Sequence, residues 1–376
     1  MLGPDPVVYY LDKHIEQWAR ITYQRGVHMP MEVVAALGLL EAGSPLTKLT
    51  ISRRDVGSMD VLIKIAYCGI CHTDLSAIRD EWSTTRYPLV PGHEIVGVVE
   101  RAGEGVRGLS AGDHVGVGTI VASCRECENC LDDLEQYCLR KRVSTYNSAD
   151  VDGSWTYGGF ASHIVVDSRF VAPVPPGLPL ESAAPLMCAG ITVYSPMKHW
   201  GIGPGSRLGV VGLGGLGHLA VKIAKALGAH VTVFSRTADK ANDAFALGAD
   251  AYCVSSDKDA MKQTRNSLDM IISTASAPGR LDRYVVLLRR DGTLVSVGLS
   301  NEDLRVHPMS LLANRRSITS SNIGSPKETA EMLEFCAQHS ITAEVEVVSA
   351  AEVNSAIERL EAGEVRYRFA LDLGTL

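Results

Sequence analysis

The feature that most constrains the fold is a glycine-rich loop between a short apolar run and a helical run. Leu208–Val211 is predicted to be a buried strand, and Leu216–Leu227 has helical spacing that ends before Gly228, a C-cap residue. The loop between them has the sequence GLGGLG, with glycines at Gly212, Gly214, Gly215 and Gly217. Glycines let the backbone turn tightly where a strand passes into a helix. The pattern predicts a strand–loop–helix unit that binds a dinucleotide pyrophosphate, although a tight turn without a ligand has the same spacing.

The segments after this loop continue to alternate between strand and helix. Further strands are predicted at Val231–Phe234, Leu268–Ser273 and Thr293–Val297, and a helix at Lys240–Leu247 ends before Gly248. This alternation is typical of a doubly wound parallel sheet, the Rossmann architecture, with helices on both faces. The fold class predicted for this region is therefore α/β.

The chain on either side of this region has a different character. Short apolar runs such as Val61–Ala66, Ile95–Val99 and Val115–Val117 are separated by Gly, Pro and Asp, which predicts an irregular β-rich unit. In the tail, helices are predicted at Lys327–Gln338 and Val353–Leu360, and a strand at Arg366–Leu373. A chain of 376 residues is too long for one compact core, so we expect two domains.

The domain boundaries follow from these changes of pattern. We predict an N-terminal extension at residues 1–29, a β-rich domain at 30–187 and 326–376, and a Rossmann domain at 188–325. In the extension, Leu11–Tyr23 has loosely helical spacing with Ile15, Trp18 and Ile21 on one face, and no apolar core of signal-peptide length is present. The extension is native, a misassigned start or an artefact of cloning, and the sequence leaves these alternatives open.

The overall charge argues against two classes of partner. The chain carries 36 basic and 43 acidic residues, a net charge of −7, which gives no electrostatic case for nucleic acid or an anionic membrane. The apolar stretches are short and interrupted, so no membrane span is predicted. A cytoplasmic location is the resulting expectation.

Four of the nine cysteines form a compact motif. The odd count, without a signal peptide, argues against a disulfide framework, and the clustering argues for metal. The motif C-x2-C-x2-C-x7-C consists of Cys124, Cys127, Cys130 and Cys138. Four thiolates complete the tetrahedral shell of a zinc ion and leave no open position, which predicts a structural zinc site. An iron–sulfur cluster uses similar spacings and stays open as an alternative.

A second set of candidate ligands is spread along the chain. Cys71 follows a predicted strand and a glycine-bearing turn at Gly69, His93 lies in the string GHE, and Cys188 ends the string LMC. Together they form a Cys2His set, which in a catalytic zinc site leaves one position for water or substrate. Taken singly, a buried Cys or His is more often a packed core residue than a ligand, so only the combination points to metal.

Together, GICHTD, GHE, the four-cysteine motif, the segment ending in Cys188 and GLGGLG resemble the zinc-dependent medium-chain alcohol dehydrogenases. The similarity is greatest to the cinnamyl-alcohol-dehydrogenase-like branch, particularly its bacterial NADP-dependent aldehyde reductases, and runs from about Pro30 to the C-terminus. The resemblance implies a GroES-like catalytic domain, a Rossmann domain and a cleft between them. It also implies a homodimer, with an exposed edge of the Rossmann sheet as the expected contact. The C-terminal tail is implied to belong to the catalytic domain.

The resemblance also implies roles for single residues around the catalytic zinc. It makes Cys71 the ligand and Cys68 a packed structural cysteine. Glu94 resembles the family's carboxylate that approaches the zinc in a resting enzyme. Asp74 resembles the carboxylate that orients the ligating imidazole and raises its basicity.

The proton relay departs from the family pattern. Thr73 is implied to exchange a proton with the substrate, and His72 to lie near the cofactor's pyrophosphate or ribose. Many family members end the relay at a histidine five residues after the ligand cysteine, and here that position is Ser76. The relay exit is therefore open between the cofactor ribose and Ser76.

Cofactor choice is encoded at the end of the second predicted Rossmann strand. NAD enzymes usually place a carboxylate there to bond the ribose hydroxyls. This chain instead offers two cations and two hydroxyls: Arg236, Lys240, Ser235 and Thr237. These groups favour the 2′-phosphate of NADP(H) over NAD, although an ordinary solvated helix start has the same composition.

The combined prediction is a zinc-dependent oxidoreductase that transfers a hydride between NADP(H) and an aldehyde or alcohol, with two zinc ions per chain. By family position, the substrate pocket is lined by Trp82, Ile120 and Asn322. The alternative is that these residues only pack against their neighbours. The rival predictions are a quinone or enoyl reductase on the same fold, a non-catalytic NADP-binding protein, and a zinc-ribbon nucleic-acid binder. The zinc ligands argue against the first two, and the acidic net charge argues against the last.

Overall fold

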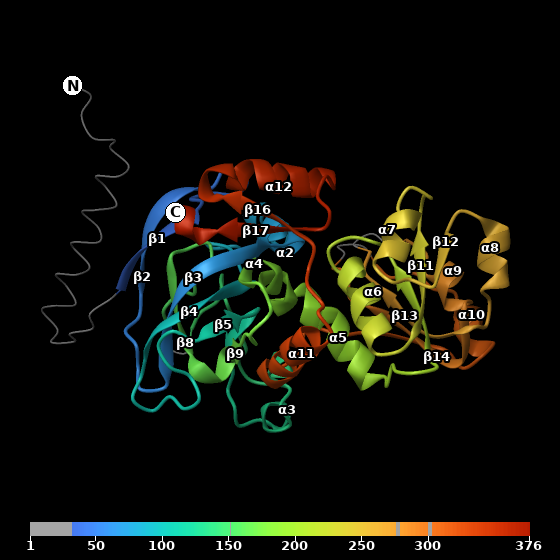
Figure 1. Ribbon diagram of the computed structural model, residues 1–376, viewed down its shortest axis with the longest axis horizontal. Coiled ribbons are helices and arrows are strands. Elements are labelled where there is room, and N and C mark those ends of the chain that lie inside the picture. The colour runs from blue at the N-terminus through green and yellow to red at the C-terminus, as the bar shows by residue number, and fades with distance from the viewer. Residues whose placement is uncertain (1–31, 151, 276–278, 300–302) are drawn as a thin grey trace, which may run out of the picture.

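The computed structural model describes residues 32–150, 152–275, 279–299 and 303–376. Two lobes lie side by side along the long axis, one β-rich and one built on a parallel sheet (Figure 1). The expectations for the N-terminal extension, including the helix at Leu11–Tyr23, lie outside the described residues. Among the residues described, no helix is long and apolar enough to cross a bilayer.

The second lobe contains a six-stranded sheet in the order β12-β11-β10-β13-β14-β15, with every neighbouring pair parallel. The strands are β10 (Arg207–Val211), β11 (His230–Ser235), β12 (Ala251–Val254), β13 (Leu268–Ser273), β14 (Leu288–Ser296) and β15 (Ser317–Ser320). This order and direction confirm the prediction of a doubly wound Rossmann sheet. The two edge strands, β12 and β15, were not predicted because they are short and only partly buried.

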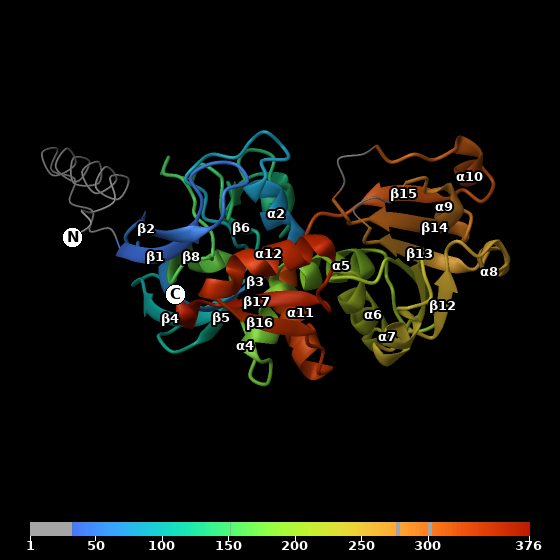
Figure 2. The same ribbon diagram turned by 90° about the horizontal axis from the view of Figure 1, so that it is seen from above.

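Helices cover both faces of this sheet, as Figure 2 shows. One face packs against α5 (Ala189–His199), α6 (Gly217–Ala226) and α7 (Ala241–Ala246), and the other against α8 (Lys258–Gln263), α9 (Asp282–Val285) and α10 (Pro308–Leu312). Consecutive strand residues point to opposite faces, so Ile271 and Ile272 belong to different core clusters. Gly228 has a φ of +89° and its N–H donates to the carbonyl of Lys225, which confirms the predicted end of α6.

The β-rich lobe is organised around β3 (Asp60–Ile70), which pairs antiparallel with β4, β8 and β17. Its main sheet also contains β5 and β9 on one side and β16 on the other. The bounds are β4 (Ile95–Ala102), β5 (His114–Val117), β8 (His163–Asp167), β9 (Val171–Pro173), β16 (Val345–Ser349) and β17 (Arg368–Asp372). Two small sheets join β1 (Glu32–Gly38) to β2 (Thr47–Arg53) and β6 (Ile120–Ala122) to β7 (Val143–Ser144). The helices of this lobe are α2 (His72–Ile78), α3 (Glu128–Leu131), α4 (Leu180–Ala183), α11 (Pro326–Gln338) and α12 (Val353–Ala362).

The last strands of the chain complete the β-rich lobe. β17 lies between β3 and β16, so the tail and the early strands are side by side in Figure 1. The helix α11 contacts β9 of the β-rich lobe and also α5, so it shares a buried core with the helices on one face of the Rossmann sheet. Because this core crosses between the lobes, the boundaries at residues 187 and 326 stay predictions.

The strand β17 offers a test of how much the tail stabilises the lobe. Phe369 is fully buried in its core, whereas Val347 in the adjacent β16 is 47% exposed. We expect Phe369→Ala to lower the free energy of unfolding by about 3–5 kcal/mol, because it removes a large buried side chain and leaves a cavity. Val347→Ala, the matched control, should change it by no more than about 0.5 kcal/mol. Urea denaturation of both variants measures the difference, and similar losses in both would contradict this account of the core.

Candidate active site and metal centres

The first candidate ligand lies where β3 passes into α2. Cys71 stands between the end of β3 and the first residue of α2, and its side chain is buried. The prediction of a turn at Gly69 was wrong, because Gly69 lies inside β3. A Cβ at this position would lie 1.9 Å from a carboxylate oxygen of Glu94. Glycine is therefore needed here to make room for Glu94 rather than to turn the chain.

One buried carboxylate connects this ligand to the second. Asp74, in the first turn of α2, accepts hydrogen bonds from the backbone N–H of Cys71 at 2.9 Å and of Gly92 at 3.0 Å. The same carboxylate lies 3.1 Å from Nδ1 of His93. Asp74 thus holds the end of β3 and the segment before β4 together and sets the orientation of the imidazole. Since Nδ1 is engaged by Asp74, Nε2 of His93 is the nitrogen available to a metal.

The third ligand comes from the entrance to the Rossmann lobe. Cys188 lies between the 3-10 turn Ala184–Met187 and α5, whose residues are buried along most of its length. Ligand atoms of Cys71, His93, Glu94 and Cys188 all lie within 4.8 Å of one another, and all four side chains are buried. Cys68, in contrast, lies in the hydrophobic core of the β-rich lobe.

The donor set of this cluster fits a zinc ion. Nε2 of His93 is buried without a hydrogen-bond partner among the described residues, as is Oε2 of Glu94. A hydrogen bond from Cys188 lowers the pKa of the Cys71 thiol well below 9.0, and thiolate is the form that binds metal. Burial by itself would lower the pKa of His93, but the charge of Asp74 outweighs it and raises that pKa above 6.5. The carboxylate thereby makes the imidazole a stronger ligand.

Arg368 is a residue of this site that the sequence analysis did not find. Its guanidinium is buried and forms an ion pair with Glu94. Burial alone would lower the pKa of Arg368. The negative groups around it, of which Glu94 has the largest effect, outweigh burial and raise that pKa above its usual value. Burial also raises the pKa of Glu94 to about 7, although the charge of Arg368 opposes this. Arg368 follows no recognisable motif, and only the return of β17 to the centre of the sheet brings it to the cluster.

The helix α2 places the residues of the expected proton relay at different depths. The Thr73 hydroxyl lies 3.7 Å from Sγ of Cys71 at the edge of the cluster. His72 is exposed, and the Ser76 hydroxyl donates to the Glu81 carboxylate at 2.7 Å near the surface. The structure therefore brings Thr73, but not His72 or Ser76, next to the ligands.

The four-cysteine motif forms a separate cluster in the β-rich lobe. The sulfur atoms of Cys124, Cys127, Cys130 and Cys138 lie within 4.8 Å of one another. The backbone N–H groups of Cys124 and Leu139 each donate to a cysteine sulfur at 3.4 Å, which stabilises thiolates. Four soft donors this close together fit a structural zinc ion, which takes a tetrahedral shell.

The glycine loop has the geometry of a phosphate-binding turn. It runs from β10 directly into α6, and Gly212 has a φ of +92°, which favours glycine. A Cβ on Gly217 would lie 2.1 Å from the carbonyl oxygen of Gly212, so the loop closes only with glycine there. A Cβ on Gly214 would meet nothing within 4 Å, which leaves that side of the loop open to a ligand. A Cβ on Gly215 would lie 2.9 Å from the Arg368 side chain, so loop and metal cluster meet at this arginine.

Two family models match the chain in the two lobes. Residues 57–176 match the alcohol dehydrogenase GroES-like domain, and residues 215–338 match the zinc-binding dehydrogenase model. NADP-dependent alcohol dehydrogenase C 1 of Mycolicibacterium smegmatis is 49% identical over 347 residues, which cover 92% of this chain and 99% of that protein. The chain belongs to the zinc-binding dehydrogenase family. It is accordingly an oxidoreductase with a GroES-like domain and a Rossmann domain, as the resemblance implied.

Other members of the zinc-binding dehydrogenase family are similarly close. Probable cinnamyl alcohol dehydrogenase 3 of Oryza sativa subsp. japonica is 49% identical, with 90% of this chain and 93% of that protein covered. A solved cinnamyl alcohol dehydrogenase from Sorghum bicolor is 45% identical with a TM-score of 0.88, covering 91% of this chain and 98% of that one. The enzyme named CAD from Helicobacter pylori, solved with NADP(H), is 37% identical with a TM-score of 0.85, covering 92% of this chain and 99% of that one.

The segment predicted to select the cofactor follows β11 in this dehydrogenase. Arg236 and Thr237 are exposed, and Ser235 and Lys240 are half-buried. Nζ of Lys240 donates to the carbonyl of Leu213 at 3.1 Å, so its charge lies beside the glycine loop. No carboxylate stands at the end of β11, although Asp239 accepts from the Thr237 hydroxyl nearby.

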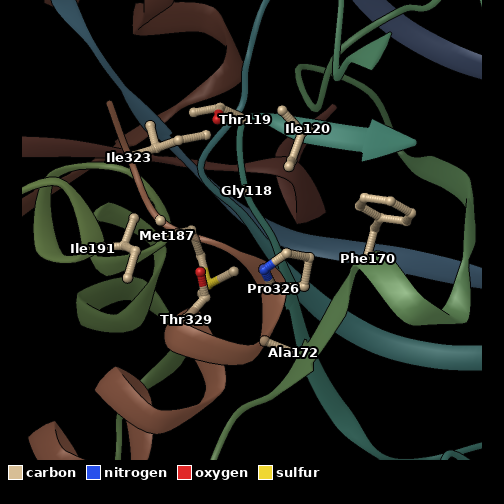
Figure 3. Close-up of a pocket in the computed structure, with 11 residues that line it drawn as sticks. Gly118, Thr119, Ile120, Phe170, Ala172, Met187, Ile191, Ile323, Pro326 and Thr329 are labelled. Carbon is tan, nitrogen blue, oxygen red and sulfur yellow. The ribbon is translucent and has the colours of Figure 1, made fainter. Parts of the chain in front are cut away.

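A small cavity lies where α11 and α5 meet the strands of the β-rich lobe. Figure 3 shows Ile120, Phe170 and Ile323 around it, and Met187, the residue before Cys188, also lines it. Of the predicted pocket residues, Ile120 lines this cavity, whereas Trp82 and Asn322 do not. The backbone N–H of Asn322 instead donates to the Tyr137 hydroxyl at 3.2 Å.

The two cysteine clusters predict separable metal losses. We expect the native dehydrogenase to hold two zinc ions per chain, Cys188→Ala to keep the structural ion, and Cys130→Ala to keep the catalytic ion. The physical reason is that each substitution removes one thiolate from one shell only. Metal analysis after gel filtration gives the zinc content of each variant. Cys253→Ala, at a buried cysteine outside both clusters, is the control, and loss of both ions from either cluster variant would contradict the assignment.

Proposed function

We propose that this chain is an alcohol dehydrogenase that uses zinc and NADP(H) and reduces aldehydes of broad specificity to primary alcohols. One observation carries the proposal: the Cys71–His93–Cys188 cluster and the glycine loop both lie beside one buried arginine, Arg368. Three protein ligands leave a position for a substrate oxygen, and the adjacent loop would bring the cofactor to it. Relatives named NADP-dependent alcohol dehydrogenase support the choice of reaction.

The chemistry of the bound groups follows from the residues that would hold them. A zinc ion on Cys71, His93 and Cys188 would supply Lewis acidity to the C–O group of the substrate, and NADPH would supply the hydride. Glu94 and Arg368 form a buried ion pair beside the ligands, so their charges are balanced without water. Burial of all four cluster residues keeps solvent away from the reacting atoms.

Thr73 is the residue that we assign to proton exchange with the substrate. Its hydroxyl lies 3.7 Å from Sγ of the ligand Cys71. In the direction of reduction it would donate a proton to the developing alkoxide oxygen. Ser76 is bonded to Glu81 at the surface, so we propose that the proton reaches water through the cofactor ribose rather than through Ser76.

The cofactor preference rests on the charge of the segment after β11. Arg236 and Lys240 would bind the 2′-phosphate of NADP(H), together with the hydroxyls of Ser235 and Thr237. The Helicobacter pylori relative was solved as a complex with NADP(H), which supports the same preference.

Assembly and location belong to the same proposal. The edge strand β15 is incompletely buried, and Met309 and Leu312 on the neighbouring α10 are 60% and 70% exposed. Pairing of two β15 edges, with these apolar side chains covered, would form a homodimer. The cytoplasmic location stays a prediction of the sequence.

Turnover of aldehydes tests the reaction directly. We expect the purified protein to oxidise NADPH when aliphatic or aromatic aldehydes are added, and Cys188→Ala to lose this activity together with one zinc. The decrease in absorbance of the reduced nicotinamide measures the rate. If the fully metallated protein turned over no aldehyde with either NADPH or NADH, the proposal would be refuted and a non-catalytic NADP-binding protein would be favoured. Reduction of alkenes instead would favour an enoyl reductase.

The role of Arg236 in cofactor choice is testable on its own. We expect Arg236→Ala to lower kcat/KM for NADPH by about ten- to a hundredfold, since one charge-assisted hydrogen bond contributes about 1.5–3 kcal/mol. The kcat/KM for NADH should stay constant, because NADH lacks the 2′-phosphate. Arg290→Ala, at an arginine with an 82% exposed side chain, is the control. Equal losses for both cofactors would rule out recognition of the 2′-phosphate by Arg236.

A further inference from the structure

His218 is a buried titratable residue that the proposed reaction does not use. It lies in the first turn of α6, directly after the glycine loop, and is 0% exposed. α6 is on the side of the Rossmann lobe that faces the β-rich lobe (Figure 1). A buried imidazole needs partners for both ring nitrogens, and these partners belong to different parts of the chain.

The partners of the ring require one tautomer. Nδ1 lies 3.2 Å from the carbonyl oxygen of Gly214, which can only accept, so Nδ1 must donate. Nε2 lies 3.3 Å from the backbone nitrogen of Glu344, whose N–H can only donate, so Nε2 must accept. The ring is therefore neutral. Burial lowers the pKa of His218 to about 3, and the nearby charges of Arg368 and Lys222 act in the same direction.

The bond to Gly214 orients the peptide group at the centre of the loop. The carbonyl oxygen of Gly214 also accepts from the backbone N–H of His218 at 3.0 Å, so two donors hold it toward α6. In a trans peptide the C=O of one residue and the N–H of the next point in opposite directions. Holding the Gly214 oxygen inward therefore points the N–H of Gly215 outward, to the open side of the loop.

The bond to Glu344 positions the arginine that touches the same loop. While its N–H donates to His218, the carbonyl of Glu344 accepts from the backbone N–H groups of Tyr367 and Arg368 at 3.1 Å each. The His218 ring also stacks on Tyr367, with centroids 4.9 Å apart and planes at 13°. The Tyr367 hydroxyl is anchored to Asp243 of α7 at 3.2 Å. One ring thus sets the backbone from which Arg368 reaches both Gly215 and Glu94.

We propose that His218 is a positioning residue that aligns the Gly215 amide and the Arg368 guanidinium on one anion, the pyrophosphate of the cofactor. The inference rests on the proposed function, since it requires that the loop binds NADP(H). His218 acts through Gly214 and Glu344 and does not itself touch the cofactor. Its contribution is therefore to the pyrophosphate and not to the 2′-phosphate, which the segment after β11 would bind.

Three substitutions separate the two bonds of the ring. His218→Leu keeps the bulk and loses both bonds, His218→Asn keeps a donor toward Gly214, and His218→Gln keeps an acceptor toward Glu344. We expect His218→Leu to raise the Kd for NADPH about tenfold, which corresponds to about 1.4 kcal/mol. The Kd for NADH should rise by the same factor, and the other two variants should fall between His218→Leu and the native protein. Fluorescence titration of the zinc-loaded protein measures each Kd.

A ligand without the pyrophosphate distinguishes positioning from a general loss of structure. We expect the Kd for 2′-AMP to stay at its native value in all three variants, and His230→Leu, at an exposed histidine of the same lobe, to bind every ligand normally. Amide hydrogen exchange of the ligand-free protein should be faster at Glu344 in His218→Leu, because the Glu344 N–H loses its acceptor, the Nε2 of His218. An equal loss of affinity for NADPH and 2′-AMP, or native NADPH binding by His218→Leu, would overturn the proposal. Native protein that bound no NADPH would refute the proposed function instead.

Discussion

The buried ion pair between Arg368 and Glu94 is the interaction on which the arrangement of this dehydrogenase depends. A guanidinium and a carboxylate are costly to remove from water, so each needs the other in a fixed position. Glu94 precedes β4 of the β-rich lobe, Arg368 begins the last strand of the same sheet, and the arginine side chain also contacts Gly215 of the Rossmann loop. The pair therefore joins the metal ligands, the tail and the cofactor loop at one buried point.

The close packing of Glu94, Arg368 and the cofactor loop depends on glycines, which have no side chain. Gly69 leaves room for the Glu94 carboxylate, Gly215 leaves room for Arg368, and Gly217 lets the loop close on Gly212. Gly215 and Gly217 both stand in the loop that the sequence pattern describes, but the pattern does not show that Gly215 makes room for an arginine. Gly69 belongs to no such pattern, because it makes room for a carboxylate from another part of the chain, and it was therefore wrongly predicted to form a turn.

The two metal clusters differ in how far apart their ligands lie in the sequence. The four cysteines of the structural cluster come from one short segment around α3, so their spacing alone predicts a shared ion. The ligands of the open cluster come from the junction of β3 and α2, the segment just before β4 and the entrance to α5. Asp74 holds the first two of these together, and no local pattern reports this. The selection of Cys71 over Cys68 therefore came from the family resemblance and not from spacing.

The sequence by itself determined the parts of this protein that depend on neighbouring residues. Strand and helix alternation predicted the parallel sheet, and the strings GLGGLG and C-x2-C-x2-C-x7-C predicted a dinucleotide loop and a four-thiolate cluster, because each is a local unit with its own geometry. Only the tertiary structure decided which distant side chains meet: Arg368 with Glu94, His218 with Glu344, and Tyr367 with Asp243. These contacts result from the return of the tail between the lobes. Since burial and charge balance at long range carry no periodic signal in the sequence, such contacts become visible only when the chain is folded.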